Sequence, residues 1–557
     1  MSQVKKNDRV EVCIIGSGAS GGVAAKVLTE KGFKVVVLER GKHLKPKDFG
    51  ADELANVNRY YTVPDPLIAP RTLRYSSHEE AEVRQFSPLP YVVGGGTSKW
   101  TGWVPRFTSS DFVQKSLHGD IDGANVADWP ISYYDLEPYY DKVEWALGVS
   151  GKAGANKYES PRSRDYPTPP LPNTKYAEKF HKGCKELGWN SYPTPSAMLS
   201  KPYNGRRESV QSAFTQHHGD PTGTKSNVLN VFLPDALATG KLDLRPDSYV
   251  RELTVDNQGR IKSAVYEDID GNLIEQEADI FIVACNAIET ARLLLLSKSG
   301  KFPNGLANNN DLVGRNLSLH EYSVAFGVFK DDPVYGWAGG GYISGSTHKF
   351  YETDYSRGFI GGGHIASTGA GLPLPIGFSI PNKPSWGSDS KKWDQQYFNH
   401  TMAVGVVIYD LPQLENRVDL DPNVKDAWGL PASRVTYDFH KNDLAQAKFL
   451  VDRAGEILEA SGADTVNKVY IEKISGNALH QMGTARMGND PETSVLNKYC
   501  QAHEVDNLYI ADGSSFPTST GANPTLSIMA NAWRVAEHIA TTRSGAYSRK
   551  MAVMDEY

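Results

Sequence analysis

The first 40 residues carry two short runs of apolar, largely β-branched residues with a helical pattern between them. Residues 10–15 (VEVCII) and 34–39 (KVVVLE) alternate little, which is typical of strands buried on both faces of a parallel sheet. Between them Val23, Val27 and Leu28 recur at helical spacing, and Gly32 supplies a stop. The sequence therefore predicts a βαβ unit at the start of the chain.

The pattern becomes mixed beyond this unit. Residues 41–90 are irregular, with prolines and exposed charge, so we expect a loop that covers the sheet. A helical segment is predicted from about residue 128 to 140, followed by a proline-rich linker to about residue 172. Residues 176–187 predict an amphipathic helix, with Phe180, Cys184 and Leu187 on its apolar stripe.

Strand patterns dominate the middle of the chain. Residues 249–255, 260–267 and 272–277 are joined by DNQG and DIDG turns and predict a β-meander, after which residues 279–284 return to a buried strand. Residues 321–440 are rich in Gly, Tyr, Trp and short alternating segments, which favours an antiparallel sheet and makes them the candidate substrate domain. Helices are predicted over residues 289–297, 442–458 and 524–540.

Composition narrows the class of protein. The 557 residues are 40% hydrophobic and 22% charged, as in globular proteins, and the 59 basic and 65 acidic residues give a net charge of −6 without a long run of one sign. Such a chain lacks the electrostatic footprint of a nucleic-acid-binding protein. We therefore expect a folded, enzyme-sized protein with no nucleic-acid partner.

Cysteine usage and hydropathy exclude further classes. The four cysteines are far apart in sequence and form no CxxC pair, so neither a zinc or iron–sulfur site nor a disulfide framework is expected. No apolar stretch approaches the ~20 residues that span a bilayer. The first ten residues show no apolar signal region, which predicts a cytoplasmic location, with export alongside a signal-bearing partner as the alternative.

A glycine-rich motif follows the first predicted strand. GSGASG at residues 16–21 opens the predicted helix, and Glu39 ends the next strand. Gly16 permits the tight turn, Gly18 lets the backbone approach a pyrophosphate, and Gly21 allows close helix packing, while the helix N-terminus favours negative charge. Glu39 would hold ribose hydroxyls and disfavours the 2′-phosphate of NADP. These features predict an ADP-dinucleotide site.

Two more glycine-containing segments are candidates for contact with a cofactor. VVGGGTSKWTG at residues 92–102 either presses backbone amides against a planar ring or forms an ordinary flexible turn. LYIADG at residues 508–513 ends a strand in Asp512 and Gly513. Further on, Asn523 is a good N-cap and Pro524 suits the first helical position, so the last helix would begin with free backbone amides. Aimed at a flavin N1–C2=O edge, they would stabilise the reduced anionic ring.

Together these motifs resemble those of the glucose–methanol–choline (GMC) flavin oxidoreductases. The resemblance rests on GSGASG with Glu39, VVGGGTSKWTG, ACNAIETARLLLLS (284–297), LVGRNLSLH (312–320), HQMGTARMG (480–488) and DGSSFPTSTGANPTLSIMA (512–530). WPISYYDLEPYY and NRVDLDPNVKDAWGLP (416–431) are similar to the bacterial branch that acts on sugars. Residues 321–440 carry no family motif that we recognise.

The resemblance implies a bound FAD and an α/β fold, α+β overall, of the p-hydroxybenzoate-hydroxylase type. A Rossmann-like FAD-binding domain would comprise residues 1–107, 225–320 and 476–545, interleaved with a substrate or lid region over 108–224 and a substrate-binding antiparallel-sheet domain over 321–475. The residues expected to contact FAD are Gly16, Ser17, Gly18, Ala19, Ser20, Gly21, Glu39, Arg40, Gly95, Gly96, Thr101, Gly102, Val250, Asp512, Gly513, Asn523 and Thr525.

By the same resemblance His480 occupies the family's catalytic-base position, and Asn523 the partner position that is His or Asn among members. Oxidising a C–H/O–H unit requires a base for the hydroxyl proton while hydride leaves carbon for flavin N5, and imidazole suits this at neutral pH. Asn523 either orients the substrate oxygen, caps the helix or does both. For His320 we expect structural packing, with an active-site position as the alternative.

Departures from the family pattern matter as much as matches. In pyranose oxidases the position of Lys99 is a histidine bonded covalently to the flavin, so a non-covalent FAD is expected here. Thr101 matches a threonine that approaches flavin N5 in that relative. Residues 204–227 contain no cysteine, which argues against the built-in iron–sulfur cluster of some dehydrogenase relatives.

Other residues of the candidate substrate domain leave two interpretations open. Trp337, Tyr342 and Trp386 either stack on the apolar face of a pyranose or pack in a core. For three histidines of this region solvated loops are expected, although one of them could contact sugar hydroxyls. They are His364, His400 and His440.

The function implied by the resemblance is oxidation of a secondary hydroxyl of a pyranose sugar or glycoside, at C3 or C2, to the keto-sugar. Oxygen, a quinone or a redox protein would accept the electrons, and a small accessory subunit is a further candidate partner. The alternatives are an aldose C1 dehydrogenase, a gluconate 2-dehydrogenase-like flavoprotein subunit and, more remotely, a lyase that keeps FAD without a net redox step.

Overall fold

The computed structural model describes residues 5–554 except 50–64, 85, 88, 212–218, 322, 337, 342–343, 370–382 and 477. Within these residues the largest sheet has the strand order β6-β2-β1-β9-β8-β7, with β19 also paired to β9. Its strands are β1 (Lys5–Ile15), β2 (Val35–Leu38), β6 (Leu242–Arg245), β7 (Tyr249–Val255), β8 (Ile261–Glu267), β9 (Leu273–Val283) and β19 (Leu508–Ile510). β6, β2, β1, β9 and β19 run parallel, whereas β7, β8 and β9 form the antiparallel meander.

The predicted βαβ unit is confirmed. β1 pairs in parallel with β2, and the final four residues of β1 and all of β2 are buried. Helix α1 (Ala19–Glu30) connects them and ends before Gly32, whose φ of +97° is the left-handed conformation that terminates helices. The site-forming loops that follow β1 and β2 therefore lie at the carboxyl edge of a parallel sheet, where α/β folds bind ligands.

Strand β9 differs from the sequence prediction. Residues 272–277 and 279–284 were expected as two strands, but β9 is continuous over Leu273–Val283. It pairs with β1 along one edge, while its other edge pairs first with β8 and then, from Phe281 to Val283, with β19. One long strand thus joins the antiparallel meander to the parallel part of the sheet.

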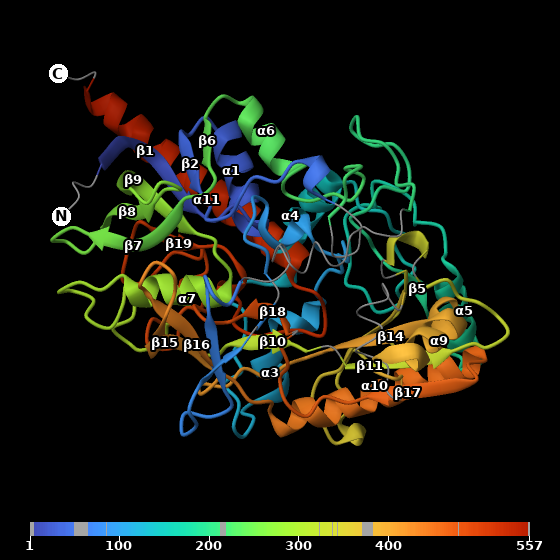
Figure 1. The fold of residues 1–557 in the computed structure, drawn as a ribbon. Coiled ribbons are helices and arrows are strands. Elements are labelled where there is room, and N and C mark those ends of the chain that lie inside the picture. Colours follow the sequence, from blue (N-terminus) through green and yellow to red (C-terminus); the bar gives the residue numbers. More distant parts are fainter. Residues whose placement is uncertain are drawn as a thin grey trace.

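The predicted antiparallel sheet is present in the order β17-β11-β14-β13-β12-β5. Its strands are β5 (Tyr192–Pro193), β11 (Ser323–Val328), β12 (Gly345–Thr347), β13 (Gly363–Gly369), β14 (Thr401–Ile408) and β17 (Thr465–Val469). Helices α5 (Lys175–Glu186) and α10 (Lys441–Ser461) pack against it, and Phe180 and Leu450 bury their side chains with Val404 and Val406. Figure 1 shows this layer apart from the β1–β9 sheet, with β10 (Ser318–His320) and β18 (Leu479–Met482) between them.

A further sheet corrects two expectations. Residues 41–90 are not only a covering loop, because β3 (Arg71–Arg74) and β4 (Glu82–Arg84) lie within them. β3 pairs in parallel with β16 (Pro431–Thr436), which pairs with β15 (Arg417–Lys425), so the part of the predicted substrate sheet around residues 417–436 belongs here instead. This sheet packs on helix α7 (Ala287–Leu296).

The remaining helices frame these sheets. They are α3 (Gln114–His118), α4 (Tyr133–Leu147), α6 (Phe232–Ala238), α9 (Gly387–Tyr397) and α11 (Thr525–Met554). α11 is longer than the predicted 524–540 and packs against α1 and α4 beside the parallel sheet (Figure 1). The domain boundaries given above stay predictions.

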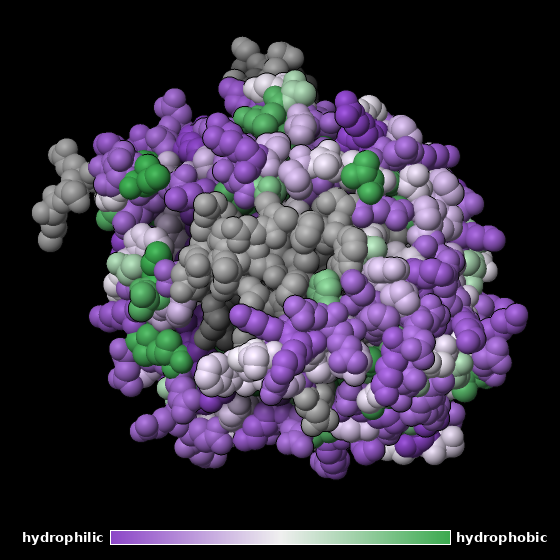
Figure 2. Space-filling model, turned by 45° about the vertical axis from the view of Figure 1, so that its right-hand side comes forward, coloured by the Kyte–Doolittle hydropathy of each residue, from purple (hydrophilic) through white to green (hydrophobic). Residues whose placement is uncertain are grey.

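The surface and the helices bear on the environment of the protein. Among the described residues we find no helix that combines the length and apolar character needed to cross a bilayer. On the face drawn in Figure 2 the described residues are mainly hydrophilic, and the hydrophobic ones are scattered, as is normal for a protein surface.

Candidate active site

The first glycine loop forms a tight cradle at the end of β1. Gly16 has φ +95°, and a Cβ there would lie 2.5 Å from the carbonyl oxygen of Ala284; a Cβ on Gly21 would lie 1.9 Å from the carbonyl oxygen of Gly16. Gly18 caps α1 without a side-chain hydrogen bond to the first turn. The backbone amides at this helix start are therefore positioned to receive an anionic group such as a pyrophosphate.

The second glycine loop contacts the first. A Cβ on Gly95 would lie 2.9 Å from the Cα of Gly18, and the N–H of Gly94 donates to Ser17 Oγ at 3.0 Å. Ser17 Oγ in turn donates to Glu39 Oε2 at 2.6 Å. The two motifs predicted to hold the cofactor are thus side by side, and Glu39 lies at their base.

Arg40 follows Glu39 and lies in an aromatic and acidic environment. Its guanidinium is centred 3.7 Å from the ring of Tyr91 and 4.7 Å from that of Tyr249, and it pairs with Glu289 at 3.2 Å. One of its nitrogens, Nη2, is buried without a hydrogen-bond partner. Because buried donors are nearly always satisfied, this nitrogen fits contact with a polar group of a bound nucleotide.

Asp512 and Gly513 join the C-terminal motif to this region. The Asp512 carboxylate accepts from Thr290 Oγ1 at 2.6 Å and from the N–H of Asn286 at 3.0 Å, just beyond β9. A Cβ on Gly513 would lie 2.5 Å from the carbonyl oxygen of Gln481, which leaves room only for glycine. The strand that carries His480 therefore lies directly against the loop after β19.

The other residues predicted to contact FAD occupy the same loops and helix starts. Ala19 and Ser20 open α1, Gly96 lies in the 3₁₀ turn Gly95–Ser98, Thr101 and Gly102 follow it, Val250 is in β7 next to Tyr249, and Thr525 opens α11. Their contacts with a cofactor stay predictions.

His480 and Asn523 are brought together from segments 43 residues apart. Asn523 Nδ2 lies 3.0 Å from His480 Nε2. His480 adopts φ +57°, an uncommon conformation for a residue with a side chain, of the kind that collects at functional sites. Part of the His480 side chain is accessible to solvent. Burial by the surrounding protein nevertheless lowers the pKa of the imidazole to about 3. At neutral pH the ring is therefore uncharged, with one of its nitrogens unprotonated.

Asn523 does not occupy the predicted helix-cap position. The first helical hydrogen bond of α11 runs from the N–H of Ile528 to the carbonyl of Pro524, so Pro524 rather than Asn523 is the N-cap. The Asn523 side chain instead points to His480. The two roles considered for Asn523 were orienting the substrate oxygen and capping the helix; its contact with the imidazole is a further one, and the first role stays a prediction.

Hydrogen bonds fix the protonation pattern of the two histidines. With the Asn523 amide oriented as it is here, its nitrogen donates to His480 Nε2, which assigns the proton of His480 to Nδ1. His480 Nδ1 lies 2.9 Å from His320 Nδ1, which accepts, and His320 Nε2 then donates to Ser519 Oγ at 2.9 Å. Burial, together with His480, holds the pKa of His320 well below its usual range, in agreement with this neutral pair.

His320 is therefore in contact with His480, and the expectation that it serves packing is incomplete. It is fully buried and lies in β10, which pairs with β18 so that His320 is opposite Leu479, the neighbour of His480. Ser519 was likewise not singled out. The hint in the sequence was the family motif LVGRNLSLH, which ends in His320; its pairing with β18 was not visible.

Two lysines with lowered pKa values are associated with the second glycine loop: Lys99 is part of it, and Lys225 contacts it. Burial lowers the pKa of Lys99 to about 8, and that of Lys225 to about 7. Lys225 Nζ donates to the carbonyl of Trp100 at 2.6 Å, which connects the segment after residue 224 to this loop. Sequence reasoning missed Lys225, because a lysine with no motif around it reads as a surface residue.

The remaining candidates are mostly placed differently from expectation. His364 and His440 are buried rather than solvated, the first beside Trp103 and the second as the N-cap of α10. His400 is half-buried and contacts the carbonyl of Phe329. Trp386 is 85% exposed and packs in no core. Trp337 and Tyr342 lie outside the described residues.

Comparison with known proteins agrees with this geometry. Two family models described as GMC oxidoreductase match residues 123–322 and 412–532, and one for a NAD(P)-binding Rossmann-like domain matches residues 14–45. The chain is 33% identical to a 2-methyl-1,2-propanediol dehydrogenase of Mycolicibacterium austroafricanum, over 99% of this chain and 98% of that one.

Two further relatives have names that refer to sugars or their derivatives. A gluconate 2-dehydrogenase flavoprotein of Pantoea cypripedii is 29% identical over 93% of this chain and 91% of its own. A 6'''-hydroxyparomomycin C oxidase of Streptomyces lividus is 31% identical over 96% and 92%. Among solved structures, a pyridoxine 4-oxidase from "Mesorbium loti" has a TM-score of 0.62 over 95% of this chain and 99% of that one, at 16% identity. The α/β, Rossmann-like fold predicted from the sequence is confirmed.

Proposed function

Because this chain belongs to the GMC oxidoreductase family and uses FAD, we propose that it oxidises a secondary hydroxyl of a pyranose or glycoside, at C3 or C2, to the ketone. It is an oxidoreductase that acts on CH–OH groups, and its relatives include enzymes named for sugar acids and aminoglycosides. The choice of a ring hydroxyl is our proposal. We further propose that FAD is held non-covalently, since Lys99 offers no imidazole for a bond to the flavin.

The observation that carries the proposal is the pairing of His480 with Asn523. His480 Nε2 is an uncharged acceptor with part of the ring accessible, so it can take the proton of a substrate hydroxyl. Asn523, at 3.0 Å from the same nitrogen, can donate to the hydroxyl oxygen and orient it. When bound, FAD supplies the hydride acceptor.

His320 contacts the second ring nitrogen of His480, Nδ1. It accepts a hydrogen bond from Nδ1–H of His480 and thereby keeps Nε2 in the unprotonated form that a base requires. Its own second nitrogen is held by Ser519. In this proposal His480 takes the proton of the substrate hydroxyl, and His320 positions the imidazole of His480.

Replacement of His480 tests the proposal. In His480→Ala, reduction of the flavin by substrate, followed anaerobically, should slow by at least ~10², the low end for a lost general base. His78→Ala, which removes an exposed histidine, is the matched control and should reduce normally. Unchanged reduction in His480→Ala would remove His480 from the mechanism.

Product analysis separates the candidate reactions. Methyl glycosides have a blocked C1, so flavin bleaching by them together with a keto product in the NMR spectrum supports ring oxidation. Bleaching by aldoses or gluconate alone would favour the C1 or gluconate alternatives, the second of which has a named relative. Bleaching by small diols alone would favour the kind of substrate for which the propanediol dehydrogenase is named. Turnover without any bleaching would favour the lyase.

The electron acceptor belongs to the same proposal. Oxygen, a quinone or a redox protein remains a candidate, and so does a small accessory subunit. Admitting air to the reduced enzyme distinguishes the first from the others, because only an oxidase recovers its flavin absorbance rapidly.

A further inference from the structure

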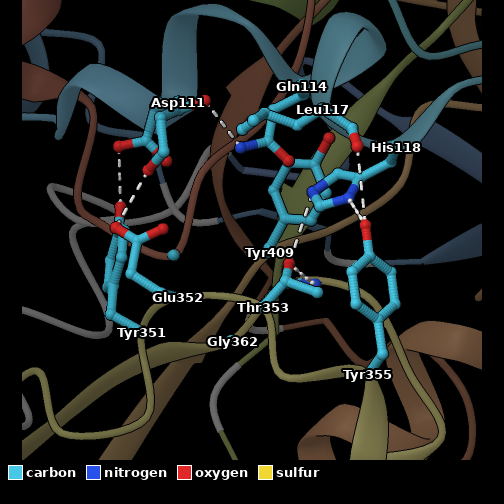
Figure 3. A pocket seen from close by; sticks show the side chains of 13 residues that line it. Asp111, Gln114, Leu117, His118, Tyr351, Glu352, Thr353, Tyr355, Gly362 and Tyr409 are labelled. Carbon is cyan, nitrogen blue, oxygen red and sulfur yellow. Dashed lines mark hydrogen bonds between the residues drawn. The ribbon is translucent and has the colours of Figure 1, made fainter.

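A pocket of about 200 Å³ opens next to α3, and its lining includes Gly521, from the loop that carries Ser519 and Asn523. At ~30 Å³ of liquid volume per water, it has room for roughly seven waters or a ligand the size of a six-membered ring. Figure 3 shows Asp111 and Glu352 on one side of this pocket and His118, Thr353 and Tyr355 on the other. None of the contacts described for His480 involves the residues that line it.

Two buried polar groups in this pocket lack a partner. Gln114 is 6% exposed, and its Nε2 donates to the carbonyl of Ser110 at 2.8 Å, which fixes the amide orientation and leaves Oε1 without a hydrogen bond. The hydroxyl of Tyr409, which is 3% exposed, also has no partner. Because such groups are costly to bury unsatisfied, they point to a ligand that hydrogen-bonds them.

The charges of the pocket select the kind of ligand. Asp111 and Glu352 are its acidic residues, and among the described residues that line it none is lysine or arginine. His118 has hydroxyl partners at both ring nitrogens, Tyr355 at 2.9 Å and Thr353 at 3.3 Å, and burial lowers its pKa. Burial raises the pKa of Asp111 to about 7, so this carboxyl is only partly ionised at neutral pH. The negative charge that Asp111 and Glu352 give the pocket is not balanced by any lysine or arginine among the described lining residues.

The Tyr409 hydroxyl can donate or accept, whereas the other open groups of the pocket are acceptors. Gln114 Oε1 accepts only, and the carboxylates of Asp111 and Glu352 accept when ionised. An alkylammonium group offers three donors and a positive charge, which matches this set better than a neutral alcohol or an anion. We propose that this pocket binds a small organic ammonium ion, with the charged nitrogen between the two carboxyl groups and Gln114.

The pocket lies against the loop that carries Ser519 and Asn523, because Gly521 of that loop lines it. Its wall includes Gly521, where a Cβ would lie 2.9 Å from the Cα of Gly363 and 3.1 Å from the ring of Tyr351. Tyr351 donates its hydroxyl to Asp111 at 2.8 Å. The ammonium site and the loop of Ser519 and Asn523 thus share a wall, although the binding proposal does not depend on the reaction proposed above.

The test is calorimetric titration of the FAD-loaded enzyme with cyclohexylammonium, which has no hydroxyl to oxidise, and with cyclohexanol as the neutral counterpart. The ammonium should bind at least tenfold more tightly. Asp111→Asn and Glu352→Gln should each weaken its binding at least tenfold, and Gln114→Met should weaken it too. Asp120→Asn, which removes a 99% exposed carboxylate nearby, should leave it unchanged.

Two controls separate a lost binding site from a misfolded variant and from the site of His480. Flavin content and thermal unfolding show whether each variant is folded; if Asp111→Asn is not, the exposed Glu352 decides, because its replacement disturbs no core. His480→Ala should bind cyclohexylammonium as the wild type does. Equal affinity for the two probes, loss of binding in His480→Ala, or normal binding in Glu352→Gln would each overturn the proposal.

Discussion

The Nδ1 atoms of His320 and His480 lie 2.9 Å apart, with the two rings edge to face and their centroids 5.0 Å apart. Two nitrogens at this distance form a hydrogen bond only if one of them carries a proton and the other does not. Since Asn523 donates to the other nitrogen of His480, the shared proton belongs to His480. In the proposed reaction, His320 thus keeps the proton of His480 on Nδ1 and leaves Nε2 unprotonated.

Removing the ring of His320 should therefore slow the reaction without removing the base. In His320→Ala we expect flavin reduction to fall roughly tenfold, the equivalent of about 1.4 kcal/mol for one lost buried hydrogen bond. His320→Gln, whose amide can accept from His480 and donate to Ser519, should recover most of the rate. Stopped-flow reduction at saturating substrate measures both. Equal rates in the two variants would contradict a positioning role.

The pH dependence of flavin reduction follows from the burial of His480. Burial lowers its pKa to about 3, and a base is active above its pKa, so the imidazole stays in its active form across the neutral range. We expect the rate of anaerobic reduction to show no loss attributable to His480 between pH 8 and pH 5. An apparent pKa near the ordinary 6.5 would mean that this histidine is not the group that titrates.

Local patterns explain which parts of the fold were predictable. The βαβ unit over residues 10–39 was predicted because burial on both faces, helical spacing and the glycine stop all occur within 30 residues of chain. β3 was missed because its sequence, RTLR, is mostly polar. Its polar side chains are satisfied by residues far away in sequence, as Arg71 pairs with Glu289 at 2.9 Å and Thr72 donates to Asp421 at 2.7 Å.

In the candidate site, too, contacts between distant segments could not be predicted from local patterns. His480 and Asn523 were identified by resemblance to a family, and the structure places them 3.0 Å apart. No pattern along the chain places His320 beside them, because its contact with His480 depends on the pairing of β10 with β18 across 160 residues. Lys225 was hidden for the same reason, since its burial depends on the fold of the loop around Trp100.

Gly21 should be essential for holding the cofactor. A Cβ at this position would lie 1.9 Å from the carbonyl oxygen of Gly16, a backbone atom that cannot move aside without opening the cradle. Gly21→Ala should therefore purify with at least tenfold less flavin per protein, measured as the ratio of flavin to protein absorbance. Gly300→Ala is the matched control, because nothing lies within 4 Å of a Cβ there. Normal flavin content in Gly21→Ala would contradict a role of this cradle in holding the flavin cofactor.

The linkage of the flavin can be checked directly. The resemblance puts Lys99 where pyranose oxidases carry the histidine that bonds to FAD. If FAD is non-covalent here, as we propose, acid precipitation of the holoenzyme should release all of the flavin into the supernatant. Lys99→His offers the reverse test, in which we expect part of the flavin to stay with the protein. Flavin that stays with the precipitated wild-type protein would contradict the non-covalent assignment.

Glu289 should contribute most to stability among the acidic residues near the cradle. It lies 2.9 Å from Arg71 and 3.2 Å from Arg40, and although burial alone would raise its pKa, these guanidinium groups and that of Arg292 lower it from 4.5 to about 2. A carboxyl with a depressed pKa in the folded state stabilises the fold above its unfolded pKa, and this contribution is lost as the pH falls toward the folded value.

We therefore expect Glu289→Gln to lower the free energy of unfolding at pH 7 by about 3 kcal/mol, the size of a broken buried ion pair. The difference from the wild type should shrink between about pH 5 and pH 2.5 as Glu289 takes up a proton. Thermal unfolding at fixed excess FAD measures it. Asp279→Asn, which breaks the exposed pair with Arg9, should cost at most about 1 kcal/mol. A difference that stays constant from pH 7 to pH 3 would show that the charge of Glu289 does not stabilise the fold.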